Sequence, residues 1–185
     1  MSRALLPLAI CLAGCASLPR YDHGVPNLVK VRDNLYRAGQ PDTPEAWKYL
    51  ASLGVTDDVK LDFVDEGDDA LAEAYGITVH YVPIEPTTRP GVLDLVEDVF
   101  AMPDPKVLAE IAGLLGEVAR GGGKIWLVHC KNGHDRTGFV VGMARMVADG
   151  WDRHHAWNEM LSLGYHPELI GLDRSFHEFK PEQRK

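Results

Sequence analysis

The sequence predicts an α/β domain in which a central, mostly parallel sheet is flanked by helices. Segments with strand-like apolar residues alternate along the chain with segments that repeat apolar residues at helical spacing. A strand-like run at 125–128 leads into a polar loop and then into a helical segment that extends to residue 147. Strands joined by helices form parallel sheets, and the loops at the carboxyl ends of such strands carry ligand sites.

The first predicted elements are two short strands and a helix. Residues 29–31 and 35–37 contain strand-like apolar residues and are separated by a turn-prone pair. Thr43 followed by Pro44 is typical of a helix start, because the first residue caps the helix and the second fits its first turn. A helix is therefore expected over 44–53, with the next glycine as its end.

A strand, a short acidic helix and a second strand follow. Residues 55–63 are expected to hold a strand, although three aspartates interrupt its apolar run. Residues 66–75 are acidic and predict a short helix, and residues 77–84 alternate in the manner of a strand. His80 is expected to be an ordinary residue of this strand, because no second His or Cys lies beside it at metal-ligand spacing.

The C-terminal half is predicted to be mainly helical. Residues 92–102 show partial helical spacing, and a clear apolar stripe predicts a helix over 105–119. Three glycines at 121–123 then turn the chain back into the strand before the polar loop. Two further helices are expected at 152–163 and 172–179, so that helices flank both faces of the sheet.

The polar loop combines a cysteine, an arginine and a threonine. Five residues separate Cys130 from Arg136, enough for the backbone N–H groups of the loop to converge at a helix N-terminus. Such an array binds an anion and stabilises a thiolate, so Cys130 is expected to be nucleophilic at neutral pH. The Arg136 guanidinium can hold two oxygens of a phosphoryl group, and the Thr137 hydroxyl lies next to it in sequence. These residues predict nucleophilic phosphoryl transfer through a cysteinyl-phosphate.

Residues 129–138 resemble the signature loop of the cysteine-dependent protein tyrosine and dual-specificity phosphatase superfamily, most closely that of its compact bacterial members. The matching residues are His129-Cys130-x-x-Gly133-x-x-Arg136-Thr137-Gly138. Residues 34–41, Asn-Leu-Tyr-Arg-Ala-Gly-Gln-Pro, also resemble the opening of those bacterial domains. The resemblance covers about residues 29–180 and implies a tyrosine-phosphatase-like single domain.

The resemblance implies a role for each residue of the signature loop. Cys130 would be the nucleophile and Arg136 the phosphate binder. Thr137 would supply a hydroxyl that assists hydrolysis, and His129 would orient and acidify the cysteine. The other members would help Arg136 to bind the substrate phosphate: Lys131, Asn132, Gly133, His134 and Asp135. Lys131 and His134 would also widen the positive rim of the loop, which would suit a second phosphate on an inositol ring.

The leaving oxygen of the substrate needs a proton, which a positioned carboxyl group typically supplies. In the family this acid comes from a loop upstream of the helix that precedes the central strand, and Asp104 stands at that place. An aspartate before a proline is also a good N-cap for the 105–119 helix. Three further carboxyl groups remain candidates for the acid: Glu85, Asp94 and Asp98.

Asp135 allows a second interpretation of the loop. In the pattern C-x-x-G-x-D-R-T it resembles the loop aspartate of phosphoinositide phosphatases such as the myotubularins, where that aspartate has a catalytic role. Alternatively, Asp135 orients Arg136 by pairing with it. The sequence leaves protein, lipid and inositol phosphates open as substrates.

The charge of the chain limits its partners. A formal net charge of -8 and a pI near 5.4 argue against binding to nucleic acid or to an anionic membrane surface. The loop must therefore create its positive potential locally, from the helix N-terminus, Lys131 and Arg136. No metal or other cofactor is expected, because the thiolate itself is the nucleophile.

The first residues resemble a bacterial lipoprotein signal peptide. A short basic start is followed by an apolar run and by the sequence Leu-Ala-Gly-Cys, which ends at Cys15. The expected organisation is a signal peptide over 1–14, a tether over 15–28 and a phosphatase domain over 29–185. The alternative is a buried N-terminal helix with an incidental cysteine. A lipid on Cys15 would anchor the chain to the membrane of the bacterial cell envelope, facing the periplasm.

The cysteines fit the same interpretation. Cys11 would leave with the signal peptide and Cys15 would carry the lipid, so that Cys130 would be the single thiol of the mature chain. A single thiol cannot form an internal disulfide, even in the oxidising periplasm.

The expected function is hydrolysis of phosphotyrosine, with phosphoserine and phosphothreonine as further candidates. The partner would be a phosphorylated protein or a small phosphomonoester. The nearest alternative is a phosphoinositide or inositol-phosphate phosphatase that uses the same loop. A non-catalytic phospho-binding lipoprotein is a third hypothesis, which Cys130 disfavours because a binding module needs no nucleophile.

Overall fold

The computed structural model describes residues 21–63, 67, 70–84 and 99–181. Its main sheet has five strands in the order β3-β4-β7-β5-β6. Their bounds are β3 (Val29–Arg32), β4 (Leu35–Gly39), β5 (Asp57–Lys60), β6 (Thr78–Tyr81) and β7 (Trp126–Cys130). The edge strand β3 is antiparallel to β4, and all other neighbours are parallel. The predicted α/β fold with a mostly parallel central sheet is confirmed.

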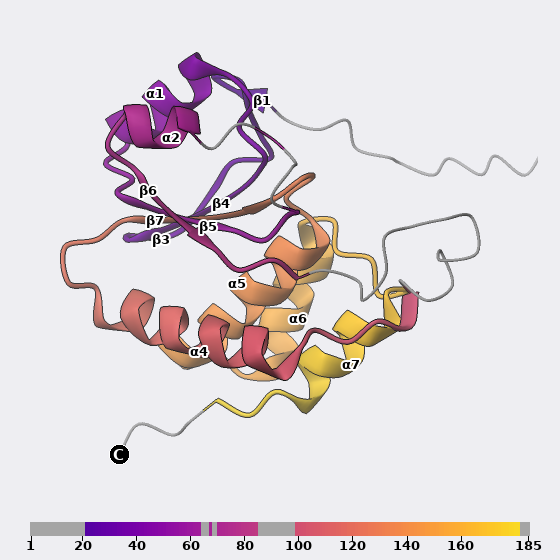
Figure 1. The fold of residues 1–185 in the computed structure, drawn as a ribbon. Coiled ribbons are helices and arrows are strands. Elements are labelled where there is room, and N and C mark those ends of the chain that lie inside the picture. The colour runs from indigo at the N-terminus through magenta and orange to yellow at the C-terminus, as the bar shows by residue number, and fades with distance from the viewer. Residues whose placement is uncertain (1–20, 64–66, 68–69, 85–98, 182–185) are drawn as a thin grey trace, which may run out of the picture.

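Helices cover both faces of this sheet (Figure 1). On one face lie α1 (Pro44–Ser52) and α2 (Ala70–Ala74). On the other face lie α4 (Pro105–Arg120), α5 (Asp135–Ala148), α6 (Arg153–Ser162) and α7 (Ile170–Glu178). The α5 helix contacts β7 and also packs against each of the other three helices on this face, so the strand before the signature loop and the helix after it form the centre of the fold.

The helix ends follow the capping residues that the sequence predicts. The Thr43 hydroxyl accepts a hydrogen bond from the Ala46 N–H, and Pro44 occupies the first turn of α1. After the C-cap of α1, Gly54 adopts a φ of +85°, which a glycine accommodates without a Cβ clash. The helix predicted at 44–53 is therefore confirmed to within one residue.

Two apolar layers hold the sheet between its helices. The larger core cluster joins α4, α5, α6 and α7 to the sheet and includes Trp126, Val128 and Phe139. The smaller cluster lies under α1 and includes Trp47 and Leu127. Successive residues of β7 thus point to opposite faces, as the pleat of a strand requires.

β5 is shorter than the predicted strand at 55–63, and its aspartates are buried rather than exposed. Asp57 contacts His80 Nε2 at 2.8 Å and accepts from Lys124 Nζ at 2.9 Å. Burial alone would raise the pKa of Asp57, but hydrogen bonds from Lys124, His80 and Thr56 outweigh it and lower the pKa. Paired carboxylates can therefore occupy a buried strand that single carboxylates would disrupt.

The predicted tether at 15–28 reaches into the folded domain. Residues 21–26 form a small hairpin, β1 (Tyr21–Asp22) with β2 (Val25–Pro26). Val25 is completely buried in the smaller core cluster, and the Asn27 amide donates to the Asn132 carbonyl at 2.9 Å. The apolar Val25, which lies in the segment predicted to be a tether, therefore packs against the core.

Other predicted elements are shorter in the structure or lie partly outside it. The described parts of the segments predicted at 66–75 and 77–84 contain α2 and β6. Most of the segment predicted at 92–102 falls outside the described residues. Among the helices that the structure does describe, none has the length and apolarity required to cross a membrane.

Candidate active site

The signature loop lies at the carboxyl end of the central strand. β7 pairs with β4 on one side and with β5 on the other, and its last residue is Cys130. The chain then turns through residues 131–134 into α5 (Figure 1). The residue Cys130 is only 3% exposed. Strand, loop and helix therefore follow one another as the sequence predicts.

The end of β4 supports the backbone of the loop. The Gln40 N–H donates to the Lys131 carbonyl at 3.1 Å. Gly133 has a φ of +72°, and a Cβ atom there would lie 2.5 Å from the Ala38 carbonyl carbon and from the Gly39 nitrogen. Only glycine fits this position, because the left-handed backbone and the close strand both exclude a side chain. The match over residues 34–41 thus has a structural reason.

Arg37 of β4 donates hydrogen bonds to the backbone of the loop. Its side chain is almost completely buried, and Nη2 donates to the Gly133 carbonyl at 2.6 Å and to the His134 carbonyl at 3.4 Å. Burial lowers the pKa of Arg37 to about 10, against the opposing effects of Cys130 and of acidic neighbours. The guanidinium thus stays charged at neutral pH. The role of Arg37 was not predicted from the sequence, although an arginine within a strand-like apolar segment is itself a signal.

Arg136 is oriented by Asp62, a residue that sequence analysis did not assign to the site. Arg136 Nη2 lies 3.1 Å from Asp62 Oδ1, and Nη1 donates to the Leu61 carbonyl at 3.3 Å. Asp62 is completely buried just after β5, and the guanidinium lies 5.9 Å from the centre of the Phe63 ring. These contacts tie the Arg136 guanidinium, from the first turn of α5, to the residues that directly follow β5.

Asp135 faces away from Arg136. Its Oδ1 accepts from the backbone N–H of His166 at 2.9 Å and lies 2.9 Å from His166 Nδ1. The hypothesis that Asp135 orients Arg136 by pairing with it is wrong, because Asp62 provides the carboxylate partner instead. Asp135 links the start of α5 to the loop before α7.

His134 does not contribute the positive charge expected at the rim. It is half-buried, and its Nε2 lies 3.2 Å from the Asn27 side-chain nitrogen. Burial is the main cause that lowers the pKa of His134 below its ordinary value of 6.5. The imidazole is therefore mainly neutral at pH 7, and the positive rim depends on Lys131 and Arg136.

His129 and Thr137 lie on either side of the loop, and both are completely buried. His129 Nε2 is 3.1 Å from Asp58 Oδ2. The Thr137 hydroxyl, in the first turn of α5, has no hydrogen-bond partner within the described residues. This hydroxyl can therefore contact a ligand or a water in the loop.

Asp104 caps α4. Its exposed carboxylate accepts a hydrogen bond from the Lys106 N–H at 2.7 Å, as an N-cap residue does. The alternative acids Glu85, Asp94 and Asp98 lie outside the described residues. The role of Asp104 as general acid stays a prediction.

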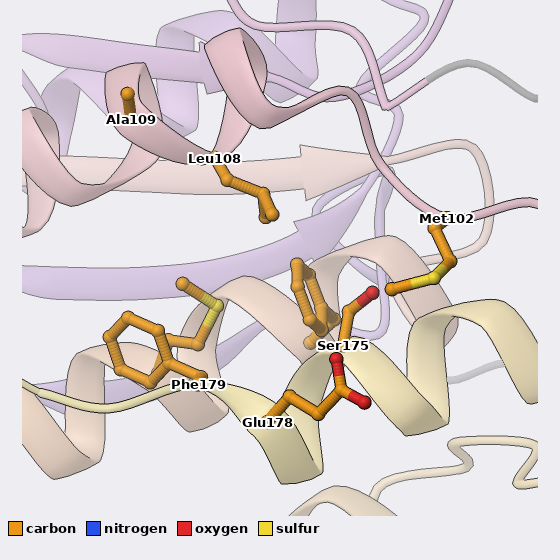
Figure 2. A pocket seen from close by; sticks show the side chains of 8 residues that line it. Met102, Leu108, Ala109, Ser175, Glu178 and Phe179 are labelled. Atoms are coloured by element: carbon orange, nitrogen blue, oxygen red, sulfur yellow. The ribbon is translucent and has the colours of Figure 1, made fainter.

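An apolar pocket of about 300 Å³ lies between α4, α5 and α7 (Figure 2). Its lining residues are Met102, Leu108, Ala109, Phe139, Met143, Ser175, Glu178 and Phe179. Phe139 directly follows the signature loop, but no loop residue lines the pocket, so it is distinct from the predicted phosphate site. In the described residues, no group of three or more His, Cys, Asp or Glu side chains could hold a metal ion.

Comparison with known proteins places this site in a family. The model of the tyrosine phosphatase family matches residues 24–155, and the chain belongs to this family. It is 30% identical over 145 residues to the dual specificity protein phosphatase TpbA of Pseudomonas aeruginosa strain UCBPP-PA14. That match covers 77% of this chain and 56% of TpbA, so the chain spans little more than half the length of this relative.

Solved structures share the fold. A crystal structure of a P. aeruginosa TpbA variant in complex with pTyr aligns with a TM-score of 0.62 at 23% identity, over 86% of this chain and 87% of that one. The core catalytic domain of the PP-IP phosphatase SIW14 from S. cerevisiae aligns with a TM-score of 0.62 at 18% identity, over 83% and 85%. At these identities the alignments show a common fold.

Proposed function

We propose that the chain is a phosphomonoester hydrolase that acts on phosphotyrosine through a cysteinyl-phosphate intermediate, with phosphoserine and phosphothreonine as further candidate substrates. The observation that carries the proposal is the position of Cys130 at the end of the central strand, next to a loop that leads to Arg136. The family membership and the name of TpbA, a dual specificity protein phosphatase, support a phosphorylated protein as substrate. The TpbA structure with pTyr supports phosphotyrosine as its phosphorylated residue.

In the first step, the Cys130 thiolate attacks phosphorus, and the bond from phosphorus to the leaving oxygen breaks. Arg136 holds two of the equatorial phosphoryl oxygens during this transfer. The leaving oxygen takes a proton from the general acid, for which we propose Asp104. In the second step, water attacks the phosphorus of the cysteinyl-phosphate and the S–P bond breaks. The Thr137 hydroxyl assists this step, the carboxylate takes the proton of the water, and inorganic phosphate leaves.

A panel assay of the purified full chain tests this function. We expect hydrolysis of p-nitrophenyl phosphate and of phosphotyrosyl peptides that persists in EDTA, because the thiolate performs the covalent step. Vanadate should inhibit it, since vanadate mimics the transferred phosphoryl group. Inositol phosphates and phosphoinositides complete the panel. A strong preference for them would favour the alternative function, a phosphoinositide or inositol-phosphate phosphatase. The name of a structural neighbour, the PP-IP phosphatase SIW14, is the reason to include these substrates. Binding of every substrate without turnover would favour a non-catalytic phospho-binding protein.

We also propose that the chain is a lipoprotein of the bacterial cell envelope, anchored through a lipid on Cys15 and facing the periplasm. The sequence Leu-Ala-Gly-Cys that ends at Cys15 supports this proposal. The wild-type chain should incorporate labelled fatty acid and enter the detergent phase, and Cys15→Ser should abolish both. Cys11→Ser is the matched control, because Cys11 lies in the apolar run just before this sequence and its substitution should leave labelling unchanged. Recovery of the wild-type chain from the cytosol with Met1 intact would refute the anchor.

A further inference from the structure

A buried ionisable pair lies directly behind the predicted nucleophile. Asp58 on β5 and His129 on β7 are both completely buried, on the face of the sheet that α1 covers. Trp47 meets the His129 ring edge-on at 6.3 Å, and Leu127 is the register partner of Asp58. A carboxylate in such an apolar layer is costly unless it has a specific partner. An apolar residue at position 58 would avoid the cost of burying a carboxylate, so we expect a function for the Asp58–His129 pair.

The contact favours one tautomer of the imidazole. Asp58 Oδ2 lies 3.1 Å from His129 Nε2, and Asp58 Oδ1 makes no hydrogen bond within the described residues. An ionised carboxylate only accepts hydrogen bonds, so a hydrogen bond between these two atoms requires a proton on Nε2. A histidine whose ring nitrogen is held by a carboxylate keeps one orientation and more readily takes up a second proton.

His129 can transmit this effect to Cys130 because the two residues are adjacent and are the last two residues of β7. An imidazole held in one orientation restricts the peptide group that joins His129 to Cys130. A protonated imidazole also stabilises the negative charge of the nearby Cys130 thiolate. Other charged groups also face these residues. Lys60 of β5 is completely buried and is the register partner of His129. Arg37 of β4 interacts electrostatically with Cys130. Arg136 lies in the first turn of α5, after the loop that follows Cys130.

We propose that Asp58 is a positioning residue that sets the reactivity of Cys130 through its contact with His129. The inference rests on the proposed function, because it assigns to Asp58 the task of preparing the nucleophile of that reaction. Asp58 would not touch the substrate. Its effect should therefore appear in the pH dependence of Cys130 rather than in the affinity for phosphate.

Alkylation of Cys130 in the free protein measures this effect without any substrate. Iodoacetamide reacts with the thiolate, and mass spectrometry of the Cys130 peptide gives the reaction rate at each pH. Asp58→Asn removes the negative charge with little change in size, so His129 loses its preference for the protonated state. We expect the midpoint of the alkylation profile to rise by about one pH unit, which is about a tenfold loss of reactivity below the midpoint. kcat should fall in parallel at acidic pH, with little change in KM.

Asp57→Asn is the matched control. Asp57 is the preceding residue of β5, is also buried and also contacts a histidine, His80. In register it pairs with Trp126, at the far end of β7 from Cys130. A merely structural role of the aspartates predicts that both variants lower the melting temperature and that neither moves the alkylation profile. Equal profiles for Asp58→Asn and Asp57→Asn would overturn the proposal.

The wild-type protein provides a second test that does not depend on the folding of a variant. A long-range ¹H–¹⁵N spectrum reports the tautomer of each histidine, and sequential resonance assignment of the wild-type protein identifies the His129 signal. We expect a proton on His129 Nε2, and a proton on Nδ1 alone would overturn the proposal. If the wild-type protein hydrolysed none of the panel substrates, the proposed function would fail. The alkylation profiles and the spectrum would still decide the role of Asp58.

Discussion

Cys130→Ser is expected to abolish turnover and to leave substrate binding intact. Serine fits the nearly buried position of the cysteine without a new contact, since the two side chains differ by one atom. A hydroxyl, however, is almost entirely protonated at neutral pH and cannot attack phosphorus as a thiolate does. Arg136 and the loop backbone remain in place to hold the phosphate, because Asp62 and Arg37 orient them independently of the sulfur.

Two measurements check this expectation. Steady-state assays with p-nitrophenyl phosphate should show no activity above background, whereas calorimetric titration with a phosphotyrosyl peptide should still show binding. Acid quenching of the wild-type reaction with ³²P-labelled substrate should trap a phosphoenzyme that the variant lacks. Cys15→Ser serves as the control and should retain turnover in detergent solution. Activity of Cys130→Ser near that of the wild type would remove Cys130 as the nucleophile.

Asp104→Asn should reduce turnover by roughly a hundredfold for a phosphotyrosyl peptide, the magnitude typical of general acid catalysis. The peptide has a poor leaving group, so its oxygen needs a proton as the bond breaks. An activated aryl phosphate leaves without this help and should be affected much less. The alkaline limb of the pH–rate profile should flatten in the variant, because deprotonation of the acid no longer limits the rate.

The structure makes this substitution a sharp test, because Asp104 also caps α4. Asparagine caps a helix about as well as aspartate does, so a cap role alone predicts little change with either substrate and an unchanged melting temperature. Asp135→Asn is the comparison variant. A large loss that depends on the leaving group in Asp135→Asn, with Asp104→Asn near wild type, would move the acid into the signature loop. That result would also favour the phosphoinositide phosphatase function.

The fold was largely predictable because its signals are local. Helix caps such as Thr43 and Asp104, and glycines such as Gly54, act over a few residues, so they can be recognised without tertiary information. The prediction was poorest at β5, where aspartates suggested a break in the strand. The groups that pair with these aspartates come from distant parts of the chain, including Lys124 and His129. A local sequence pattern does not identify such partners.

The residues of the candidate site could be located from the sequence where they are contiguous. Cys130, Arg136 and Thr137 occur in one short segment, and the full motif over residues 129–138, between a strand and a helix, predicts the loop. The charge state of His134 was not predictable, because it depends on burial beside Asn27, a residue more than a hundred positions earlier. Sequence analysis likewise placed Asn27 in a tether and missed its contact with the loop.

The sequence by itself determined the family-specific loop with its cysteine and the α/β alternation that places this loop at the end of a strand. Tertiary structure alone decided which groups hold the loop in shape: Arg37 from β4, Asp62 after β5, Asp58 behind His129, and His166 opposite Asp135. The physical reason is that hydrogen bonds and ion pairs act over a few ångströms of space. Strand pairing brings together residues that lie 70 or more positions apart in the chain, as Asp58 and His129 do.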